Sequence, residues 1–417
     1  MTECVIEIVE NHETNVTEDA TKALAASFRK HIRPKPSSKS CIYRAPKCLR
    51  EVKEEAYEPK IISFGPFHKG KKSLQAMEEH KTWYIHDFLS QSPESCLEDM
   101  IKAIKELEGD ARDCYDEPID MTSDEFVKMR NFGVHETPDG ISRTPWMYGT
   151  IERDMLLLEN QLPFFVLESL FNITRHPSVG SVSLSVMVLA FFQGTFSTLS
   201  SVLVNPEIKG KHHILELIHS HILSSSPEID NEASDGLVSI PSAFDLCESG
   251  VQFKKKVTKE YSVSNITFSD EGRFEIPPLD FYPITESFIY NLIALEHCDH
   301  YYYKNWVTSY VCLLDFIINT EKDVRLLCRK EIISNNMGSD EDLALIINKL
   351  ASGAYTAFYY AELCKRVNSY HRKDINRWRA SLKRNYFSSP WTTASVIAAF
   401  ILLVLTFLQT LFSILSY

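Results

Sequence analysis

The sequence predicts a mainly α-helical protein with a small antiparallel β hairpin or sheet and a single C-terminal transmembrane helix. Three observations predict this fold class. Apolar residues recur at helical spacing along most of the chain, whereas one short region alternates with a period of two residues. In addition, no charged residue follows Arg384, and this tail contains an apolar run long enough to cross a bilayer.

The composition is that of a globular protein whose length exceeds the usual limit for one core. Of the 417 residues, 44% are hydrophobic and 24% are charged. Because single cores rarely grow beyond about 250–300 residues, we expect two lobes. The net charge of -12 argues against a nucleic-acid partner, which would need a basic surface. The first ten residues, "MTECVIEIVE", do not predict a secretory signal.

We divide the chain by changes in composition. Six acidic residues followed by the basic run "RKHIRPKPSSK" predict disorder at the N-terminal end. The polar run "SSSPEIDNEASDG" is the best internal boundary. The predicted parts are a disordered segment (1–38), a helical first lobe (39–223), a polar linker (224–238), an α+β second lobe (239–384) and a transmembrane helix (392–415).

Elements of the first lobe follow from local patterns. "KIISF" (60–64) predicts a short strand, and helices are expected over 73–89 and 97–107. On the first of these helices, Leu74, Met77, Trp83 or Tyr84, and Phe88 share one face. The stretch 131–149 is rich in turn residues and predicts irregular structure. Residues 177–206 lack charge but contain many serines, which favours a buried helix over a second membrane span. Gly194 marks a position where this helix could be interrupted.

The second lobe begins with strand patterns and then becomes helical. Ile266 and Phe268 pair naturally with Phe274 and Ile276 across "SDEGR", which predicts a β-hairpin with Gly272 in its loop. One helix is expected to begin at Thr285 as its N-cap, with Phe288, Leu292 and Leu295 on its apolar face. A second helix is expected from the spacing of Val307, Val311 and Leu314. A third helix is expected after a capping box at Ser339–Asp342.

The run "LLLENQLPFF" (156–165) places three polar residues inside an apolar region. Pro163 fits the first turn of a helix, so Asn160 is a natural N-cap for that helix. Glu159 and Gln161 are then placed to bond the backbone groups left exposed at the junction. We therefore interpret this run as a buried corner between two helices rather than as a chemical site.

A glycine-rich segment offers the one candidate for cofactor binding. Gly65, Gly70 and Lys71 match the first part of a phosphate-binding P-loop, after a predicted strand and before a predicted helix. The next position of a P-loop is a serine or threonine that holds magnesium, but here it is Lys72, with Ser73 one place late. A Gly-Pro turn between strand and helix is the simpler reading. A nucleotide-dependent enzyme therefore remains the alternative function.

Other clusters of reactive residues lack the spacing that chemistry needs. "EHCDH" (296–300) and the histidines His212, His213, His219 and His221 do not show metal-ligand spacing. No nucleophile elbow is present. We therefore expect no catalytic residues, no metal, no cofactor and no small-molecule substrate.

The oxidation state of the cysteines and the glycosylation of the sequons depend on the cellular compartment. The ten cysteines contain no Cys-x-x-Cys pair, which favours reduced, buried thiols in a chain without a signal peptide. Some disulfide pairing is the alternative if the domain is lumenal. Sequons at Asn15, Asn172 and Asn265 are expected to stay unmodified if the domain is cytoplasmic.

The C-terminal run "ASVIAAFILLVLTFLQTLFSIL" (394–415) has 22 residues. As a helix it would be about 33 Å long, enough to cross a bilayer core. Trp391 lies at its entrance, and basic residues dominate 372–384. By the positive-inside rule, we expect a single-pass membrane protein whose bulk is cytoplasmic. The alternative is a buried core helix of a soluble protein.

Six long segments carry a resemblance to a known family: "IYRAPKCLREVKEEAYEPKIISFGPFHKGKKSLQAMEEHK", "RDMLLLENQLPFFVLESLF", "IPSAFDLCESGVQFKKK", "FEIPPL", "TESFIYNLIALEHC" and "NYFSSPWTTASVIAAFILLVLTFLQT". In these segments the chain resembles the plant family catalogued as domain of unknown function 247. The resemblance implies a plant membrane protein, usually with one C-terminal span and without an established enzyme activity or catalytic residues. Some grass relatives are implicated in self-incompatibility recognition in pollen. After "DEFVKM" the chain departs from the family pattern, which predicts a shortened or missing core helix.

These observations lead to one expected function and two rivals. The expected function is a non-enzymatic interaction or recognition module, anchored to a membrane and binding unknown protein partners. The first rival is the nucleotide-binding enzyme built on 65–73. The second is a channel or transporter component that uses both uncharged stretches.

Overall fold

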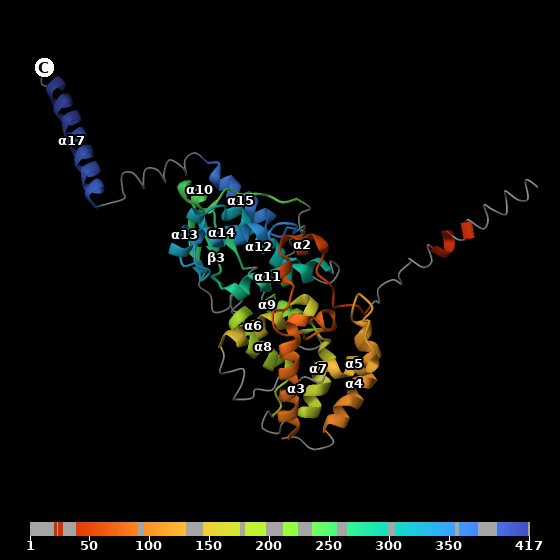
Figure 1. Ribbon diagram of the computed structural model, residues 1–417. Coiled ribbons are helices and arrows are strands. Elements are labelled where there is room, and N and C mark those ends of the chain that lie inside the picture. Colours follow the sequence, from red (N-terminus) through yellow and green to blue (C-terminus); the bar gives the residue numbers. More distant parts are fainter. Residues whose placement is uncertain are drawn as a thin grey trace, which may run out of the picture. The chain divides into compact units, whose positions relative to one another are not determined.

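The computed structural model shows a predominantly helical chain that divides into two compact units, Met1–Ser40 and Cys41–Tyr417 (Figure 1). The predicted disorder of 1–38 falls mostly outside the described residues. The predicted linker 224–238 is described only from 236 onward, so the division into two lobes stays a prediction. The structure describes residues 21–22, 24–27, 39–90, 96–130, 145–175, 180–196, 212–223, 236–256, 265–298, 305–354, 358–373 and 390–415.

The part before residue 224 contains helices and short 3-10 turns, which confirms the helical prediction. The predicted helices at 73–89 and 97–107 are present, and the second is longer than expected because it continues to Asp113. The α-helices are α2 (Lys47–Val52), α3 (Gln75–Ser90), α4 (Cys96–Asp113), α5 (Ser123–Arg130), α6 (Pro145–Met155), α7 (Phe164–Thr174), α8 (Leu184–Phe196) and α9 (Ile214–Ile222). The 3-10 turns are η1 (Glu54–Ala56), η2 (Pro66–His68), η3 (Lys72–Leu74) and η5 (Leu158–Asn160).

The part after residue 236 combines helices with short strands. The helices predicted around Val307 and after Ser339 are both present, and the Ser339 hydroxyl accepts from the Asp342 N–H at 3.0 Å. The helices are α10 (Ala243–Glu248), α11 (Pro283–Cys298), α12 (Trp306–Ile317), α13 (Glu321–Arg329), α14 (Asp340–Leu350), α15 (Ala361–His371) and α17 (Pro390–Leu415). The strands are β1 (Gln252–Lys255), β2 (Thr267–Phe268), β3 (Arg273–Ile276), β4 (Leu279–Phe281) and β5 (Ile333–Asn335).

The predicted β-hairpin is confirmed. Strands β2 and β3 pair antiparallel, with Phe268 opposite Phe274, and Gly272 adopts a φ of +81° in the turn. Glycine is suited to this left-handed conformation because it has no Cβ. The sheet of β1, β3 and β2 is nevertheless mixed, because β1 pairs parallel with β3, and the second sheet is parallel, because β4 pairs parallel with β5. Strands of three or four residues are too short to show a clear period, so the sequence did not reveal these parallel pairs.

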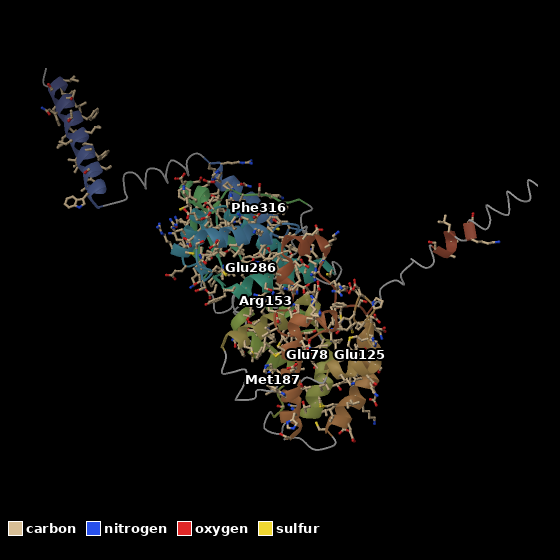
Figure 2. All side chains as sticks on the ribbon, viewed as in Figure 1. Glu78, Glu125, Arg153, Met187, Glu286 and Phe316 are labelled. Carbon is tan, nitrogen blue, oxygen red and sulfur yellow. The ribbon has the colours of Figure 1, made fainter. Side chains whose placement is uncertain are left out.

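Helix α11 is the central element of the folded unit. It is buried from Thr285 to Glu296 and touches α12, α14, α6, α9, η1 and η5. Figure 2 shows the side chains, with Glu286 on α11 and Arg153 on α6. The Asn291 side chain donates to the Ala56 carbonyl at 2.9 Å and accepts from the Leu158 N–H at 2.8 Å. One amide on α11 therefore bonds to two segments that are about a hundred residues apart in sequence.

Three local predictions differ from the structure. Helix α11 begins at Pro283 rather than after Thr285, because proline fits a first helical turn. The Thr285 hydroxyl still serves the helix start by accepting from the Tyr282 N–H at 3.2 Å. Residues 145–149 belong to helix α6, although an irregular stretch was predicted there, and 131–144 lie outside the described residues. Trp83, one of the two alternatives predicted on the core face of α3, is 66% exposed, and the side chain of the other, Tyr84, lies outside the described part of the structure.

The uncharged stretch 177–206 forms helix α8 over the part that the structure describes. Gly194 lies within this helix, so no break occurs there. Leu189 and Phe192 are buried, as predicted, whereas Met187 is 39% exposed. Residues 197–206 lie outside the described ranges.

Candidate functional site

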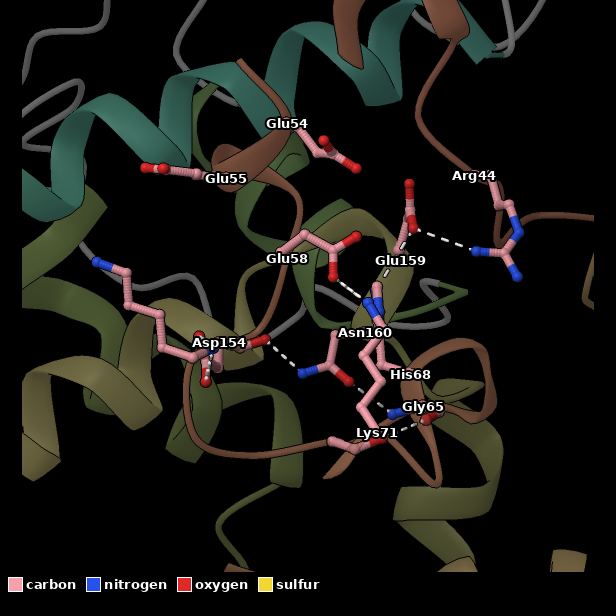
Figure 3. Close-up of polar contacts among 12 residues, drawn as sticks. Arg44, Glu54, Glu55, Glu58, Gly65, His68, Lys71, Asp154, Glu159 and Asn160 are labelled. Carbon is pink, nitrogen blue, oxygen red and sulfur yellow. Dashed lines mark hydrogen bonds and ion pairs between the residues drawn. The ribbon is translucent and has the colours of Figure 1, made fainter. Parts of the chain in front are cut away.

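The junction between α6 and α7 contains four polar side chains that are almost completely buried. Asp154, Glu159, Asn160 and Gln161 are each at most 1% exposed, although leucines surround them in sequence. We call these four residues the polar corner, and Figure 3 shows three of them, Asp154, Glu159 and Asn160. Because a buried polar group is costly unless it is hydrogen-bonded, the partners of these side chains define what the corner does.

Asn160 uses both ends of its amide. Its Oδ1 accepts from the Phe64 N–H at 2.6 Å and the Gly65 N–H at 3.0 Å. Its Nδ2 donates to the Ile62 carbonyl at 3.0 Å and the Asp154 carbonyl at 2.8 Å. Asn160 thus bonds to a distant loop rather than capping the next helix.

The prediction that Asn160 is an N-cap is therefore wrong. Helix α7 begins at Phe164, and Pro163 occupies the cap position without a side-chain hydrogen bond. The Phe164 N–H instead donates to the His212 carbonyl at 2.7 Å. The buried corner between two helices is as predicted, but its polar residues face another segment of the chain.

Asp154 explains why "KIISF" (60–64) is not a strand, contrary to the prediction. The carboxylate accepts from the backbone N–H groups of Lys60, Ile61 and Ile62 at 2.9, 2.8 and 3.1 Å. It also accepts from Arg153 Nη1 at 2.7 Å. Side chains of the corner take the backbone hydrogen bonds that a neighbouring strand would otherwise supply.

Gln161 bonds exposed backbone groups at the junction, as predicted, whereas the prediction is wrong for Glu159, whose backbone partner lies in a distant segment. Gln161 Nε2 donates to the Met155 and Leu157 carbonyls at 2.8 and 2.7 Å. Glu159 Oε1 accepts from the Ala45 N–H at 3.0 Å. Carbonyls at the end of α6 would otherwise lack intrahelical partners, so the Gln161 amide completes that helix.

Glu159 also belongs to an ion cluster, which we define as Arg50, Glu58, His68, Lys71 and Glu159. Arg50 bridges the two carboxylates, with Nη1 at 2.8 Å from Glu58 Oε1 and Nη2 paired to Glu159. The imidazole of His68, 1% exposed, lies between them, 3.6 Å from Glu58 Oε2 and 3.4 Å from Glu159 Oε2. Lys71 pairs with Glu58.

The electrostatics of this cluster favour charged carboxylates. Burial alone would raise the pKa of Glu58, but hydrogen bonds from Lys71 and Arg50 outweigh it and lower this pKa to about 2. The pKa of Glu159 is likewise lowered, because contacts with His68 and Arg50 outweigh its burial. A general acid or base works best with a pKa near the working pH, and both carboxyl groups move away from it. The cluster is arranged for ion pairing rather than for proton transfer.

The glycine-rich segment does not have the local structure of a P-loop. Residues 60–64, which the structure describes, do not form the strand that a P-loop follows, and the Gly65 N–H is already bonded to Asn160. Gly70 has a φ of +83° in a turn between η2 and η3. The Lys71 ammonium, which would contact phosphates in a P-loop, pairs with Glu58.

Replacing Gly65 by alanine is expected to destabilise the fold by about 2 kcal/mol or more. An added Cβ would lie 2.7 Å from the Gln161 carbonyl oxygen, which is backbone and cannot move aside cheaply. Urea denaturation of the full chain in mild detergent measures this loss. Gly109→Ala, in helix α4 with nothing within 4 Å of the new Cβ, is the control and should not destabilise the protein. Equal stability of both variants would contradict the close approach at Gly65.

Acid pH is expected to weaken the fold through Glu58. Its folded-state pKa of about 2 lies below the ordinary value of about 4.3, so its contribution is present above pH 4.3 and lost as the pH falls towards 2. Asp116 acts in the opposite direction. Burial raises its pKa to about 6, so its ionisation makes the folded protein less stable as the pH rises from about 4 to 6. Thermal unfolding between pH 4.5 and 2 is the measurement. Glu58→Gln should show a shallower fall than the wild type, and parallel curves would contradict this prediction.

Two of the histidines considered above as metal ligands, His213 and His219, are buried among protein groups. His219 Nε2 lies 2.9 Å from the buried Glu296 carboxylate, which also accepts from the Val307 and Thr308 N–H groups at 3.0 and 2.8 Å. Burial lowers the pKa of His213 to about 4. Within the described ranges, no group of His, Cys, Asp and Glu side chains is arranged to hold a metal ion. Residues 299 and 300 of "EHCDH" lie outside those ranges.

The cysteines are only partly as predicted. The nine in the described part of the chain are free thiols, and Cys41, Cys96, Cys114, Cys312 and Cys364 are buried. Cys48 and Cys247 are exposed, which contradicts the expectation of uniformly buried thiols. Both lie in helices of only six residues, which have too few turns to show which face is buried.

Comparisons with known proteins place this arrangement in context. The sequence profile of DUF247, described as "Plant protein of unknown function", matches residues 42–405. The chain is 29% identical over 419 residues to the UPF0481 protein At3g47200 of Arabidopsis thaliana, covering 90% of this chain and 87% of that protein. It is 23% identical over 483 residues to the putative UPF0481 protein At3g02645 of the same plant, covering 89% and 90%. No solved structure matches the chain.

Proposed function

Because the chain belongs to DUF247, a plant family of unknown function, we propose a role from the structure itself. We propose a membrane-anchored, non-enzymatic interaction module, with the folded unit 41–373 on the cytoplasmic side. The observation that carries this proposal is helix α17, whose 22-residue segment Ala394–Leu415 has a mean hydropathy of 2.4 and is not buried in the protein. Within the described residues, this is the one helix long and apolar enough to cross a membrane.

The size of the exposed apolar surface supports membrane insertion. Thirteen large apolar side chains between Ile397 and Leu415 are exposed, and Trp391 at the helix start is 84% exposed. Burying one such side chain is worth about 1.5–3 kcal/mol, so the whole helix gains on the order of 20–40 kcal/mol by leaving water. A bilayer supplies an environment that covers all sides of the helix at once.

The polar residues of α17 are compatible with a bilayer core. Thr406 donates to the Leu402 carbonyl and Thr410 to the Thr406 carbonyl, both at 2.8 Å. Hydrogen bonds within the helix satisfy these hydroxyls, as a medium without water requires. The preceding stretch 372–384 is rich in lysine and arginine, which favours a cytoplasmic location for the part before the helix.

The candidate site supports an interaction role rather than catalysis. The polar corner bonds backbone groups, and the carboxylates of the ion cluster are paired with basic side chains. These contacts hold the segment after Cys41 against the α6–α7 junction. A scaffold of this kind presents a defined surface to a protein partner.

Membrane insertion is tested by alkaline extraction of membranes from cells that express the full chain. The wild type should stay in the membrane fraction. A variant with Leu403→Arg and Phe407→Arg should be extracted, because each charge at the helix centre costs about 2.5–3.5 kcal/mol. Gln409→Leu is the matched control and should stay in the membrane. Extraction of the wild type would overturn the anchor.

Orientation is tested by protease treatment of intact microsomes that carry the full chain. The folded unit should be digested without detergent, and Asn172 and Asn265 should carry no glycan. Protection of the folded unit, or glycans on these sequons, would overturn the cytoplasmic assignment.

The non-enzymatic assignment is tested against its nucleotide-binding rival. ATP and GTP are titrated into the full chain in mild detergent, with Lys71→Ala as the comparison. No saturable binding is expected, because Lys71 is paired with Glu58. Saturable binding by the wild type that Lys71→Ala removes would overturn the proposal.

A further inference from the structure

Two cysteines that are 73 positions apart lie side by side where the second unit begins. The N–H groups of Cys41 and Ile42 donate to the Cys114 carbonyl at 2.8 and 2.9 Å, and the Asp116 N–H donates to the Ile42 carbonyl at 3.1 Å. Ile42 and Tyr115 form a parallel β-bridge. Cys41 and Cys114 each precede a residue of this bridge by one position.

The bridge gives the two cysteines a geometry that suits a disulfide. Paired parallel chains lie about 4.8 Å apart, and the Cys41 N–H donates directly to the Cys114 carbonyl at 2.8 Å, so the two backbones approach closely at these positions. This spacing lies within the Cα–Cα range of about 4.4–6.8 Å that disulfides occupy. The side chains of Cys41 and Cys114 also belong to the same small buried cluster, which keeps the two thiols near one another.

The surroundings keep the pair together. Cys41 and Cys114 are 6% and 7% exposed and form a small apolar cluster with Ile42 and Tyr115. The contact between the thiols, together with burial, raises the pKa of Cys41 well above its ordinary value. A raised pKa disfavours the thiolate, so oxidation should be slow near neutral pH and faster as the pH rises.

We propose that Cys41 and Cys114 form a reversible intramolecular disulfide, which makes this pair a redox modification site. The oxidant is a small disulfide such as oxidised glutathione. One cysteine thiolate attacks a sulfur of oxidised glutathione and releases one glutathione thiolate. The second cysteine thiolate then displaces the other glutathione and closes the disulfide. The two cysteines lose two protons and two electrons, and one oxidised glutathione becomes two reduced glutathione molecules.

The disulfide would fix the start of the folded unit. In the dithiol form, backbone hydrogen bonds and the small apolar cluster hold Cys41 and Ile42 against the end of α4. Three residues later, the Ala45 N–H bonds to Glu159 of the polar corner. A covalent link at Cys41 would therefore fix the backbone just before the residue that contacts the polar corner. On the cytoplasmic side proposed above, reduced glutathione would keep this link open, and a rise in oxidised glutathione would close it.

The linked state can be identified directly by mass spectrometry. Trypsin releases each cysteine in its own peptide, "SCIYR" (40–44) and "DCYDEPIDMTSDEFVK" (113–128), and each contains one cysteine. The folded full chain in mild detergent is incubated with oxidised glutathione, its remaining thiols are alkylated, and it is digested. We expect a linked pair of these peptides that dithiothreitol separates. Two singly alkylated peptides after oxidation of the folded protein would overturn the proposal.

A stability readout separates the link from other oxidation. Oxidation should raise the thermal unfolding midpoint of the wild type by roughly 5 °C or more, because the link closes a long loop in the unfolded chain. Cys114→Ser should lose this increase, whereas Cys48→Ser, at an exposed thiol, should keep it. An equal increase in the wild type and Cys114→Ser, or formation of the linked peptides only after denaturation, would overturn the proposal.

Discussion

Replacing Asn160 by alanine is expected to lower the free energy of unfolding by about 4 kcal/mol. The substitution leaves four buried backbone groups without their partner: the N–H groups of Phe64 and Gly65 and the carbonyls of Ile62 and Asp154. Each buried polar group left unpaired costs about 1–3 kcal/mol. Urea denaturation of the full chain in mild detergent, followed by tryptophan fluorescence, measures the loss.

Asn172→Ala is the matched control for this experiment. Asn172 is an asparagine twelve positions later, on the exposed face of α7, where alanine suits the helix. Its substitution should change the free energy of unfolding by no more than about 0.5 kcal/mol. Similar midpoints for the two variants would contradict the assignment of Asn160 as the link between the corner and the loop.

Asp154→Ala is expected to cost a similar amount, about 4 kcal/mol. Three consecutive N–H groups, from Lys60 to Ile62, lose their acceptor. The buried guanidinium of Arg153 also loses its charged partner at 2.7 Å. Breaking one side of a buried ion pair is costly because the remaining charge stays out of water.

The expected loss for Asp154→Ala can be checked against an exposed aspartate. Asp280 lies on β4 with its side chain exposed, so Asp280→Ala should leave stability nearly unchanged. Amide hydrogen exchange adds a local readout. Exchange at Lys60, Ile61 and Ile62 should accelerate in Asp154→Ala, and unchanged protection of these three amides would contradict the assigned hydrogen bonds.

Elements with a strong period could be predicted from the sequence. Helix α12 shows buried Val307, Val311 and Leu314 at the predicted spacing. The hairpin followed from alternation around Gly272. Both depend on neighbours in sequence, so a local pattern contains the information needed to place them.

Only the position of the candidate site could be predicted from the sequence, because local patterns do not identify its distant partners. Glu159 and Gln161 sit at a junction between helices, which the sequence revealed. Their partners Ala45 and Leu215 come from distant segments, and single-sequence patterns do not indicate such contacts. His68 and Arg50 were not predicted as members of the site. The available signal was that each is a basic side chain within a segment already singled out by its pattern.

The absence of a strand at 60–64 has the same cause. Ile61, Ile62 and Phe64 have high strand propensity, but a strand also needs a neighbouring chain with free hydrogen-bonding groups. Here Asp154 and Asn160 supply these bonds from their side chains. Tertiary contacts therefore override the local preference.

The polar corner also determines when this protein can fold. The bonds from Asp154 and Asn160 to the loop span 92 to 98 residues of sequence. During synthesis, the loop emerges long before its partners are made, and its apolar residues remain accessible to chaperones. Contacts of such high sequence separation also slow folding, because a long loop must close before they form. We therefore expect the N-terminal part of the unit to acquire its structure late, after the ribosome has passed Asn160.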